Sequence, residues 1–199
     1  MSYTRSEKFL RRPKGVTLFE TALATIIIGV AITAMVKIAI YTSQQMAYSQ
    51  RRSQAMMLAE NIREMMVGLP FSDPGYGTTT FGPEAGETGL AQYDDVDDFD
   101  GFNSSVRADI ANGSPVGPID ANRNVITEIV AGVTQVPMEM RNYKQQIAVD
   151  PVSTADLTLT LAKPNTARTA VRVTVMVSYR SPGTSTWNVV ATLRWVKTR

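Results

Sequence analysis

Five aspartates occupy seven positions of the run YDDVDDFDGF, residues 93–102, the one motif after the N-terminal region whose residues could do chemistry. Carboxylate oxygens are the ligands that Ca²⁺ prefers, and the Asp-Gly pair at the end of the run favours a turn. The EF-hand pattern is absent, because no glutamate closes the loop at its twelfth position, and acidic loops without a metal are common. Two interpretations stay open, a calcium site and a solvated loop, and the candidate ligands are Asp94, Asp95, Asp97, Asp98 and Asp100.

A single carboxylate, Glu20, lies in the otherwise uncharged run VTLFETALATIIIGVAITAMV, residues 16–36. A charged side chain inside a bilayer costs at least ~2.5–3.5 kcal/mol on insertion scales, so Glu20 is expected to have a partner or a function. Residues 1–15 carry five cations against Glu7, a local charge of +4, and these cations are Arg5, Lys8, Arg11, Arg12 and Lys14.

The chain of 199 residues contains no histidine and no cysteine. It therefore lacks the commonest general base, the commonest transition-metal ligand and any disulfide or zinc-thiolate site. No Gly-rich phosphate loop or nucleophile elbow is present either, so we predict that the protein is not an enzyme. Between residues 73 and 120, ten carboxylates face the single cation Arg107, which argues against nucleic-acid binding.

Residues 16–36 are long enough to cross the hydrocarbon core of a membrane as a helix. All the basic residues of the leader precede this run, so the positive-inside rule places the N-terminus in the cytoplasm and sends the chain after Lys37 across the membrane. The apolar run is longer than the apolar region of a cleaved secretory signal, which has roughly 7–15 residues, and the nearest small-residue site, residues 47–49, follows more than ten residues later. We therefore do not expect removal there.

Apolar residues continue at spacings of three and four beyond the membrane run, which predicts an amphipathic helix. Gly68 and Pro70 supply a stop. The pattern predicts one helix over residues 16–69, with a transmembrane part at 16–41 and an amphipathic part at 42–69. The apolar stripe consists of Ala55, Leu58, Ala59, Ile62, Met65, Met66 and Leu69.

The rest of the chain, residues 70–199, is expected to form one globular head. Residues 70–122 are rich in glycine and aspartate and predict a long acidic loop region. Alternating residues predict an antiparallel β-sheet over about 143–196, with strands at 143–149, 156–161, 171–179 and 187–196 and with Trp187 and Trp195 in the core. Packing of one sheet face on the helix stripe gives an α+β fold.

The junction KGVTLFE, with Gly15 before Val16 and Glu20 at the fifth position of the apolar run, resembles the prepilin leader of type IV pilins and type II secretion pseudopilins. The resemblance implies that a prepilin peptidase removes residues 1–15 on the cytoplasmic side and that the new amine of Val16 is methylated. Valine departs from the phenylalanine or methionine with which most members begin. In that family the Glu20 carboxylate would pair with the Val16 amine of a neighbouring subunit and so set the register of assembly.

The same resemblance implies a pilin-like fold, a single-pass protein of the bacterial inner membrane with a periplasmic head, and a cell-surface pilus or periplasmic pseudopilus after assembly. The expected partners are the prepilin peptidase/methyltransferase, other pilin subunits and the inner-membrane assembly platform. The lack of a cysteine pair makes the chain more similar to a minor pilin or pseudopilin than to a major subunit. Its acidic run also resembles a stretch in pilins of the mannose-sensitive haemagglutinin type.

One alternative from another class stays open. The chain would then be an uncleaved, signal-anchored extracytoplasmic binding or sensor protein, and KGVTLFE would be a chance match.

Overall fold

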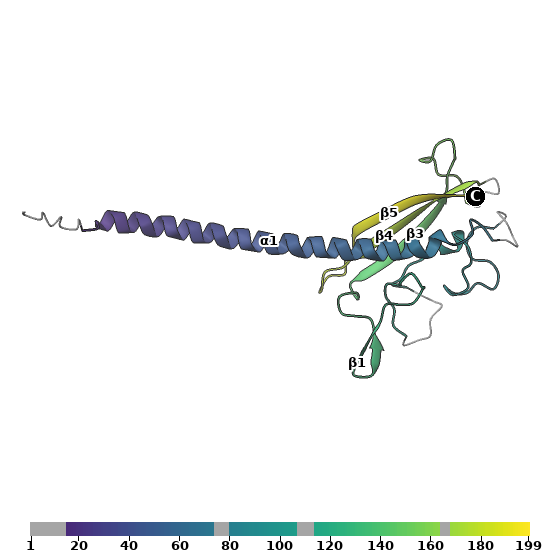
Figure 1. Cartoon of the computed structure of the whole chain (residues 1–199), viewed down its shortest axis with the longest axis horizontal. Helices are drawn as coiled ribbons and strands as arrows, with labels where there is room; N and C mark the ends of the chain where they lie inside the picture. Colours follow the sequence, from purple (N-terminus) through teal and green to yellow (C-terminus); the bar gives the residue numbers. More distant parts are fainter. Residues whose placement is uncertain (1–14, 74–79, 107–113, 164–167) are drawn as a thin grey trace, which may run out of the picture. The chain divides into compact units, whose positions relative to one another are not determined.

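The structure, a computed structural model, describes residues 15–73, 80–106, 114–163 and 168–199. In these residues it contains one long helix, a short 3₁₀ helix and two small antiparallel sheets, so the predicted α+β class is confirmed. The chain divides into two compact units, an N-terminal unit that ends at Ala47 and a C-terminal unit that begins at Tyr48. Helix α1 contributes to both units (Figure 1).

Helix α1 extends over Leu18–Val67, inside the predicted span of 16–69. Proline at position 70 cannot continue the helical hydrogen bonds, and the chain turns away after Val67. The ammonium group of Lys197 donates to the carbonyl oxygens of Met66 (3.4 Å), Val67 (3.1 Å) and Leu69. A cation from the last strand therefore satisfies the carbonyl groups that the end of a helix leaves without partners.

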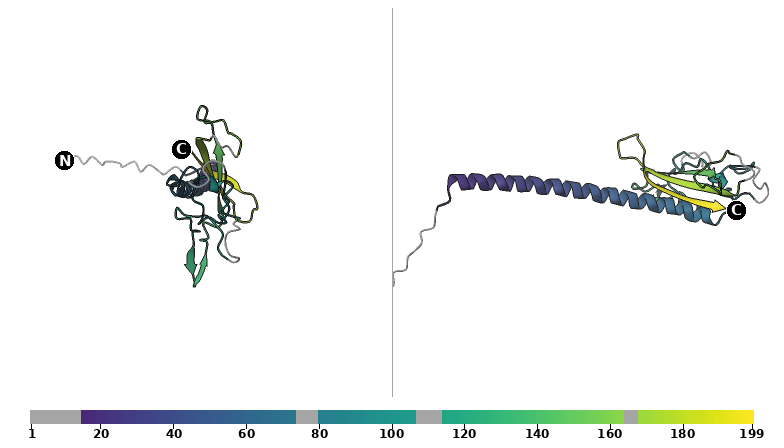
Figure 2. Two further views of the ribbon diagram at one scale, coloured as in Figure 1. Left: turned by 90° about the vertical axis from the view of Figure 1, so that its right-hand side faces the viewer. Right: turned by 90° about the horizontal axis from the view of Figure 1, so that it is seen from above.

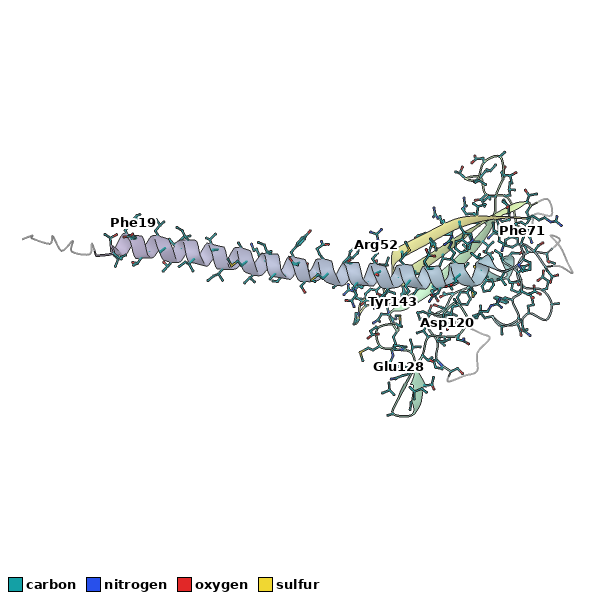
Figure 3. The ribbon with its side chains drawn as sticks, in the orientation of Figure 1. Phe19, Arg52, Phe71, Asp120, Glu128 and Tyr143 are labelled. Carbon is teal, nitrogen blue, oxygen red and sulfur yellow. The ribbon has the colours of Figure 1, made fainter. Side chains whose placement is uncertain are left out.

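In the N-terminal unit, α1 buries none of its apolar side chains within the chain. Its most apolar 18-residue window has a mean hydropathy of 2.4 and is 0% buried, so this helix is long and apolar enough to cross a membrane by length and composition. Side chains project from all sides of this half, Phe19 among them (Figure 3). A helix that is apolar all round has to be covered by lipid or by protein.

In the C-terminal unit, the second half of α1 lies along a three-stranded sheet (Figure 1). The strands are β3 (Tyr143–Pro151), β4 (Ala170–Tyr179) and β5 (Asn188–Thr198), in the order β3-β4-β5, and both pairs are antiparallel. The predicted apolar stripe of the helix is confirmed, because six of its residues are buried against this sheet: Ala55, Leu58, Ala59, Ile62, Met65 and Met66.

Strand β3 alternates between buried and half-buried residues as predicted. Its inward residues are Tyr143, Gln145, Ile147 and Val149, each at most 2% exposed. Gln145 is the polar member of this face, and its side chain joins three segments of the core. Its Nε2 donates to the carbonyl oxygens of Leu58 (2.9 Å) and Ile119 (3.0 Å), and its Oε1 accepts from the N–H of Ile119 (2.7 Å).

The outer edge of β3 is covered by residues 100–104, which lie within the predicted acidic loop region. The N–H of Gly101 donates to the Ile147 carbonyl (3.1 Å), and the N–H of Ile147 donates to the Phe102 carbonyl (3.0 Å). The N–H of Ser104 donates to the Gln145 carbonyl (2.9 Å). This pairing protects a strand edge that would otherwise be open to association with another chain.

A β-bulge in the β4–β5 pair corrects part of the predicted core. The register shifts between Val177, opposite Ala191, and Ser178, opposite Val189, so Val190 is the extra residue. In the residues of β5 that precede the bulge, the alternation between inward and outward side chains is therefore reversed. Val189, which regular alternation would place on the same face as Trp187 and Trp195, is 58% exposed, and Val190 packs against the core instead.

The two tryptophans of this last segment have different environments. Trp195 packs against the core as predicted. Trp187 precedes the bulge and lies half-buried outside the core, with Lys144 Nζ 5.1 Å and Arg180 Cζ 4.9 Å from its ring centroid. The prediction for Trp187 was therefore wrong, because the bulge moves it off the core face.

The strand predicted at residues 156–161 is also absent. Asp156 Oδ1 accepts from the backbone N–H (2.9 Å) and the hydroxyl (2.6 Å) of Thr158 and closes a turn. These local hydrogen bonds compete with strand pairing, and only an isolated bridge between Val152 and Thr160 forms.

A second, two-stranded sheet was not predicted. Strands β1 (Glu128–Val130) and β2 (Val133–Gln135) form an antiparallel hairpin that projects from the C-terminal unit (Figure 2). Ala131 and Gly132 connect them, with φ angles of 51° and 80°. Two positive φ angles are typical of a type I′ turn, for which Asn-Gly is the usual sequence signal and Ala-Gly is not.

Candidate functional site

The N-terminal candidate site begins at Gly15, where the chain itself does not require a glycine. A Cβ added at Gly15 would meet nothing within 4 Å, and its φ lies outside the left-handed region. Val16 follows with 68% of its surface exposed. A glycine that no contact within the described residues explains is compatible with a requirement imposed by another molecule.

Helix α1 starts at a cap that the sequence reading missed, although the T-x-x-E pattern of residues 17–20 signals it. Thr17 Oγ1 accepts from the backbone N–H of Glu20 (3.3 Å), and the Thr17 carbonyl accepts from the N–H of Thr21 (3.2 Å). Thr17 is thus the N-cap and Glu20 the third helical residue, which is one half of a capping box. The negative charge of Glu20 is also favourable near the positive end of the helix dipole.

The Glu20 carboxylate has no side-chain partner among the residues that the structure describes. The threonines of the same helix half differ, because their hydroxyls donate to carbonyls of the preceding turn: Thr21 to Leu18 (2.8 Å), Thr25 to Ala22 (2.8 Å) and Thr33 to Gly29 (2.8 Å). These hydroxyls need no outside partner in an apolar environment. Glu20 is therefore the polar side chain of residues 16–36 that has most to gain from one.

A shallow groove on the exposed helix surface lies near the middle of this half. It is lined by Ile26, Gly29, Val30, Thr33, Ala34 and Lys37. Gly29 costs about 0.5–1 kcal/mol in a helix interior relative to alanine, and a Cβ there would touch nothing within the chain. Small residues of this kind let a second helix approach closely.

The second candidate site is the acidic run, which the structure separates into buried and exposed carboxylates. Asp95, Asp97 and Asp98 are only 1%, 2% and 2% exposed, whereas Asp94 is exposed and Asp100 is half-buried. Of the five candidate ligands, Asp94 and Asp98 alone belong to a group of described acidic oxygens that all lie within 4.8 Å of one another. The solvated-loop interpretation also fails for the three buried aspartates.

Two of the buried aspartates shape the backbone around the short helix η1 (Asp97–Phe99). Asp95 Oδ1 accepts from the N–H groups of Asp97 (2.8 Å) and Asp98 (3.3 Å). Asp98 Oδ2 accepts from the N–H groups of Asp94 (2.9 Å) and Asp95 (3.1 Å). The two carboxylates thus cap each other's segment, which explains why the run folds into a tight turn.

Asp97 is engaged in a buried ion pair. Its Oδ2 lies 2.7 Å from Arg168 Nη2 and accepts from the N–H of Gly82 (3.2 Å). Arg168 is 1% exposed and its guanidinium Cζ lies 4.8 Å from the centroid of the Phe81 ring. A buried pair of this kind is costly to break because the remaining charge has no solvent.

Asp100 serves the strand edge. Its Oδ1 accepts from the backbone N–H of Val149 (2.9 Å), and both carboxylate oxygens lie 3.0 Å from Lys163 Nζ. The carboxylate thus acts as the hydrogen-bond acceptor that a neighbouring strand would otherwise supply.

The remaining carboxylates of the run meet acidic residues from the preceding segment. Oxygens of Glu87, Asp94 and Asp98 lie within 4.8 Å of one another, and so do oxygens of Asp73, Glu84 and Glu87. The two groups share Glu87. The sequence reading missed Glu84 and Glu87 because their proximity to Asp98 arises from the loop fold rather than from spacing.

The titration of the cluster reflects burial among like charges. Burial raises the pKa of Glu87 to about 7, with the charges of Asp98 and Glu84 adding to the rise and a hydrogen bond from the Glu84 N–H opposing it. Burial also raises the pKa of Asp95 to about 8, helped by the charge of Asp97, and raises the pKa of Asp97 and of Asp98. Carboxylates in this state are stabilised by any nearby positive charge.

Comparisons of the chain with protein-family models, with curated proteins and with solved structures found no match.

Proposed function

We propose that the protein is a structural subunit, a minor pilin or pseudopilin, of a type IV pilus or type II secretion-like filament. Prepilin peptidase removes residues 1–15, and the subunits polymerise through their N-terminal helices. The observation that carries the proposal is the N-terminal half of α1, which is apolar on all sides, buries nothing within its own chain, and starts directly after the Gly15–Val16 junction.

A helix of this kind needs a cover in every state of the protein. Before assembly the bilayer supplies it, since the apolar window is long enough to cross the hydrocarbon core. After assembly the helices of other subunits supply it, and the groove at Gly29 gives a place of close approach. The head remains outside the membrane in both states.

In a filament, Glu20 has a function that it would not have in a simple membrane anchor. Processing creates a protonated amine at Val16, and that amine pairs with the Glu20 carboxylate of a neighbouring subunit. Each charge is costly alone in an apolar surrounding, and the pair is tolerated. Subunits that add in the wrong register leave both charges unpaired, so the pair selects the correct one.

The alternative, an uncleaved signal-anchored binding or sensor protein, is favoured by one observation. The Thr17 cap places Glu20 in the first helical turn, where its charge stabilises a lone helix without any second subunit. The chemical state of residue 16 distinguishes the two functions.

The test is mass spectrometry of the full-length gene product extracted from membranes of its native host. Processing predicts a chain that starts at Val16, with or without a methyl group on its amine. Intact residues 1–15 on the mature protein would overturn the proposal and support the signal-anchor function.

A further inference from the structure

The acidic cluster of the head contains buried carboxylate oxygens that are available for a ligand. Asp98 is 2% exposed and its Oδ2 is occupied by two backbone N–H groups, whereas its Oδ1 is buried and has no hydrogen-bond partner among the described residues. In the same part of the chain, Glu84 Oε2 is also buried without a partner, while its Oε1 accepts from the Thr80 hydroxyl. A buried carboxylate oxygen left in this state is costly unless a cation compensates it.

The spacing of the neighbouring carboxylates fits one cation. Oxygens of Glu87, Asp94 and Asp98 all lie within 4.8 Å of one another. Calcium–oxygen bonds are about 2.4 Å long, so two oxygens on opposite sides of one Ca²⁺ are about 4.8 Å apart. All three oxygens are therefore close enough to bind the same ion, and Asp94, which is exposed, leaves one side open to water.

Among the described residues, no Arg or Lys side chain forms an ion pair with this group. The ion pairs between described residues use Asp97, Asp100 and Asp150 in the head, and none joins Arg or Lys to Glu84, Glu87, Asp94 or Asp98. We propose that Glu87, Asp94 and Asp98 bind a Ca²⁺ ion, with the negative charge of Glu84 close by, since its oxygen lies within 4.8 Å of a Glu87 oxygen.

The donor set indicates which ion binds. The chain has no histidine or cysteine, so a site for Zn²⁺ or Cu²⁺ with nitrogen or sulfur ligands is excluded. Mg²⁺ requires a near-ideal octahedron and retains several waters, whereas Ca²⁺ accepts irregular sets of carboxylate, carbonyl and water oxygens. The three ligands come from an irregular loop, in which Glu87 is half-buried and Asp98 is buried. Such a set suits Ca²⁺ better than Mg²⁺.

This ligand set differs from the one that the sequence predicts. Asp95 Oδ1 caps η1, Asp97 Oδ2 pairs with Arg168, and Asp100 pairs with Lys163. None of these three aspartates belongs to a group of described acidic oxygens that all lie within 4.8 Å of one another. Asp94 and Asp98 remain, and Glu87 replaces the other three. The site therefore connects the segment before the acidic run to the run itself.

The experiment uses the full-length protein in detergent, freed of metal with EDTA and dialysed. Calcium chloride is titrated in by calorimetry, and the melting temperature Tm is followed by circular dichroism. We expect binding and a Tm rise of about 5 °C or more at saturating Ca²⁺, because a ligand that binds only the folded state stabilises it. No binding and no Tm shift at millimolar Ca²⁺ would overturn the proposal.

Two variants and one control distinguish Ca²⁺ binding at this site from a nonspecific effect of Ca²⁺ on the negative charge of the protein. Asp94→Asn and Glu87→Gln keep the shape of a ligand and remove its charge, and each is expected to weaken Ca²⁺ binding at least about tenfold. Glu128→Gln, in the exposed β1 strand, removes the same charge elsewhere and is expected to bind Ca²⁺ like the wild type. Undiminished binding in both ligand variants, or an equal Tm rise with magnesium chloride, contradicts the proposal.

Discussion

At the scale of the residue, identical carboxyl groups acquire different functions from what surrounds them. Asp95 and Asp98 accept backbone N–H groups, Asp97 pairs with Arg168, and Asp100 serves a strand edge. Glu20 differs from all of these, because no group among the described residues of its own chain pairs with it. From the residue type alone, each carboxylate could accept hydrogen bonds or bind a cation. The fold determines which of these it does.

The residue-scale prediction concerns Glu20→Leu. If Glu20 pairs with the Val16 amine of a neighbour, the substitution leaves that amine buried and unpaired, at a cost of roughly 3–5 kcal/mol. Processing should survive while incorporation into filaments fails. Fractionation of cells into membrane and sheared-filament pools measures this, beside the wild type.

A matched control for that experiment is Thr25→Leu, in the same half of α1. Its hydroxyl donates to the Ala22 carbonyl 2.8 Å away and needs no outside partner, so its loss should leave both pools unchanged. If Glu20→Leu enters filaments as well as Thr25→Leu does, the pairing is refuted and the cap at Thr17 is a sufficient explanation of Glu20.

At the scale of the element, the C-terminal half of α1 and strand β3 are joined by packing and by one buried side chain. Gln145 satisfies the N–H and carbonyl groups of Ile119 and reaches the Leu58 carbonyl of the helix. The Tyr143 hydroxyl donates to Gln54 Oε1 (2.9 Å), also on the helix. Figure 3 shows Tyr143 beside α1. The helix is thereby held to the sheet at specific positions and not only by apolar contact.

The element-scale prediction is that Gln145→Met destabilises the head. Methionine fills a similar volume but leaves the backbone groups of Ile119 buried without partners, and each such group costs about 1–3 kcal/mol. We expect a loss of roughly 2–5 kcal/mol in the free energy of unfolding. Gln146→Met, on the opposite face of the same strand, is the control and should change it by less than about 1 kcal/mol. Urea denaturation of the full chain in detergent, followed by tryptophan fluorescence, measures both, and equal stability of the two variants would contradict this role for Gln145.

How much of the fold can be predicted depends on whether a local pattern or a tertiary contact sets each element. The stripe at residues 55–66 and the alternation in β3 and β4 are visible in the sequence, because one face of each element must be buried. The reversed alternation before Ala191 is not visible, because the bulge arises from pairing with β4. Likewise the approach of Glu87 to Asp98 depends on how the loop folds, whereas the T-x-x-E cap was readable and was missed.

At the scale of the whole molecule, the two units have different physical requirements. The C-terminal unit is stabilised by its own core, in which α1 residues pack on a sheet. The described part of the N-terminal unit buries none of its apolar side chains, and its apolar surface requires a cover of lipid or protein. A helix with such a surface is covered by a membrane, by other copies of the chain, or by each in turn. Under the proposed function, removal of residues 1–15 precedes the change from the first cover to the second.

The whole-molecule prediction concerns Gly15→Leu. A Cβ at position 15 meets nothing within 4 Å in the described chain, so the substitution should leave the fold and the membrane insertion of the protein unchanged. A peptidase cleft that requires an extended backbone without a side chain at this position would reject it, and unprocessed precursor should accumulate in the inner membrane.

Gly29→Ala is the control, since it also replaces a glycine that contacts nothing in the chain but lies far from the junction, and it should be processed normally. Immunoblotting of membrane fractions separates precursor from mature chain by the mass of residues 1–15. Mature-sized protein from Gly15→Leu would show that cleavage does not depend on this junction and would contradict the proposed processing by prepilin peptidase.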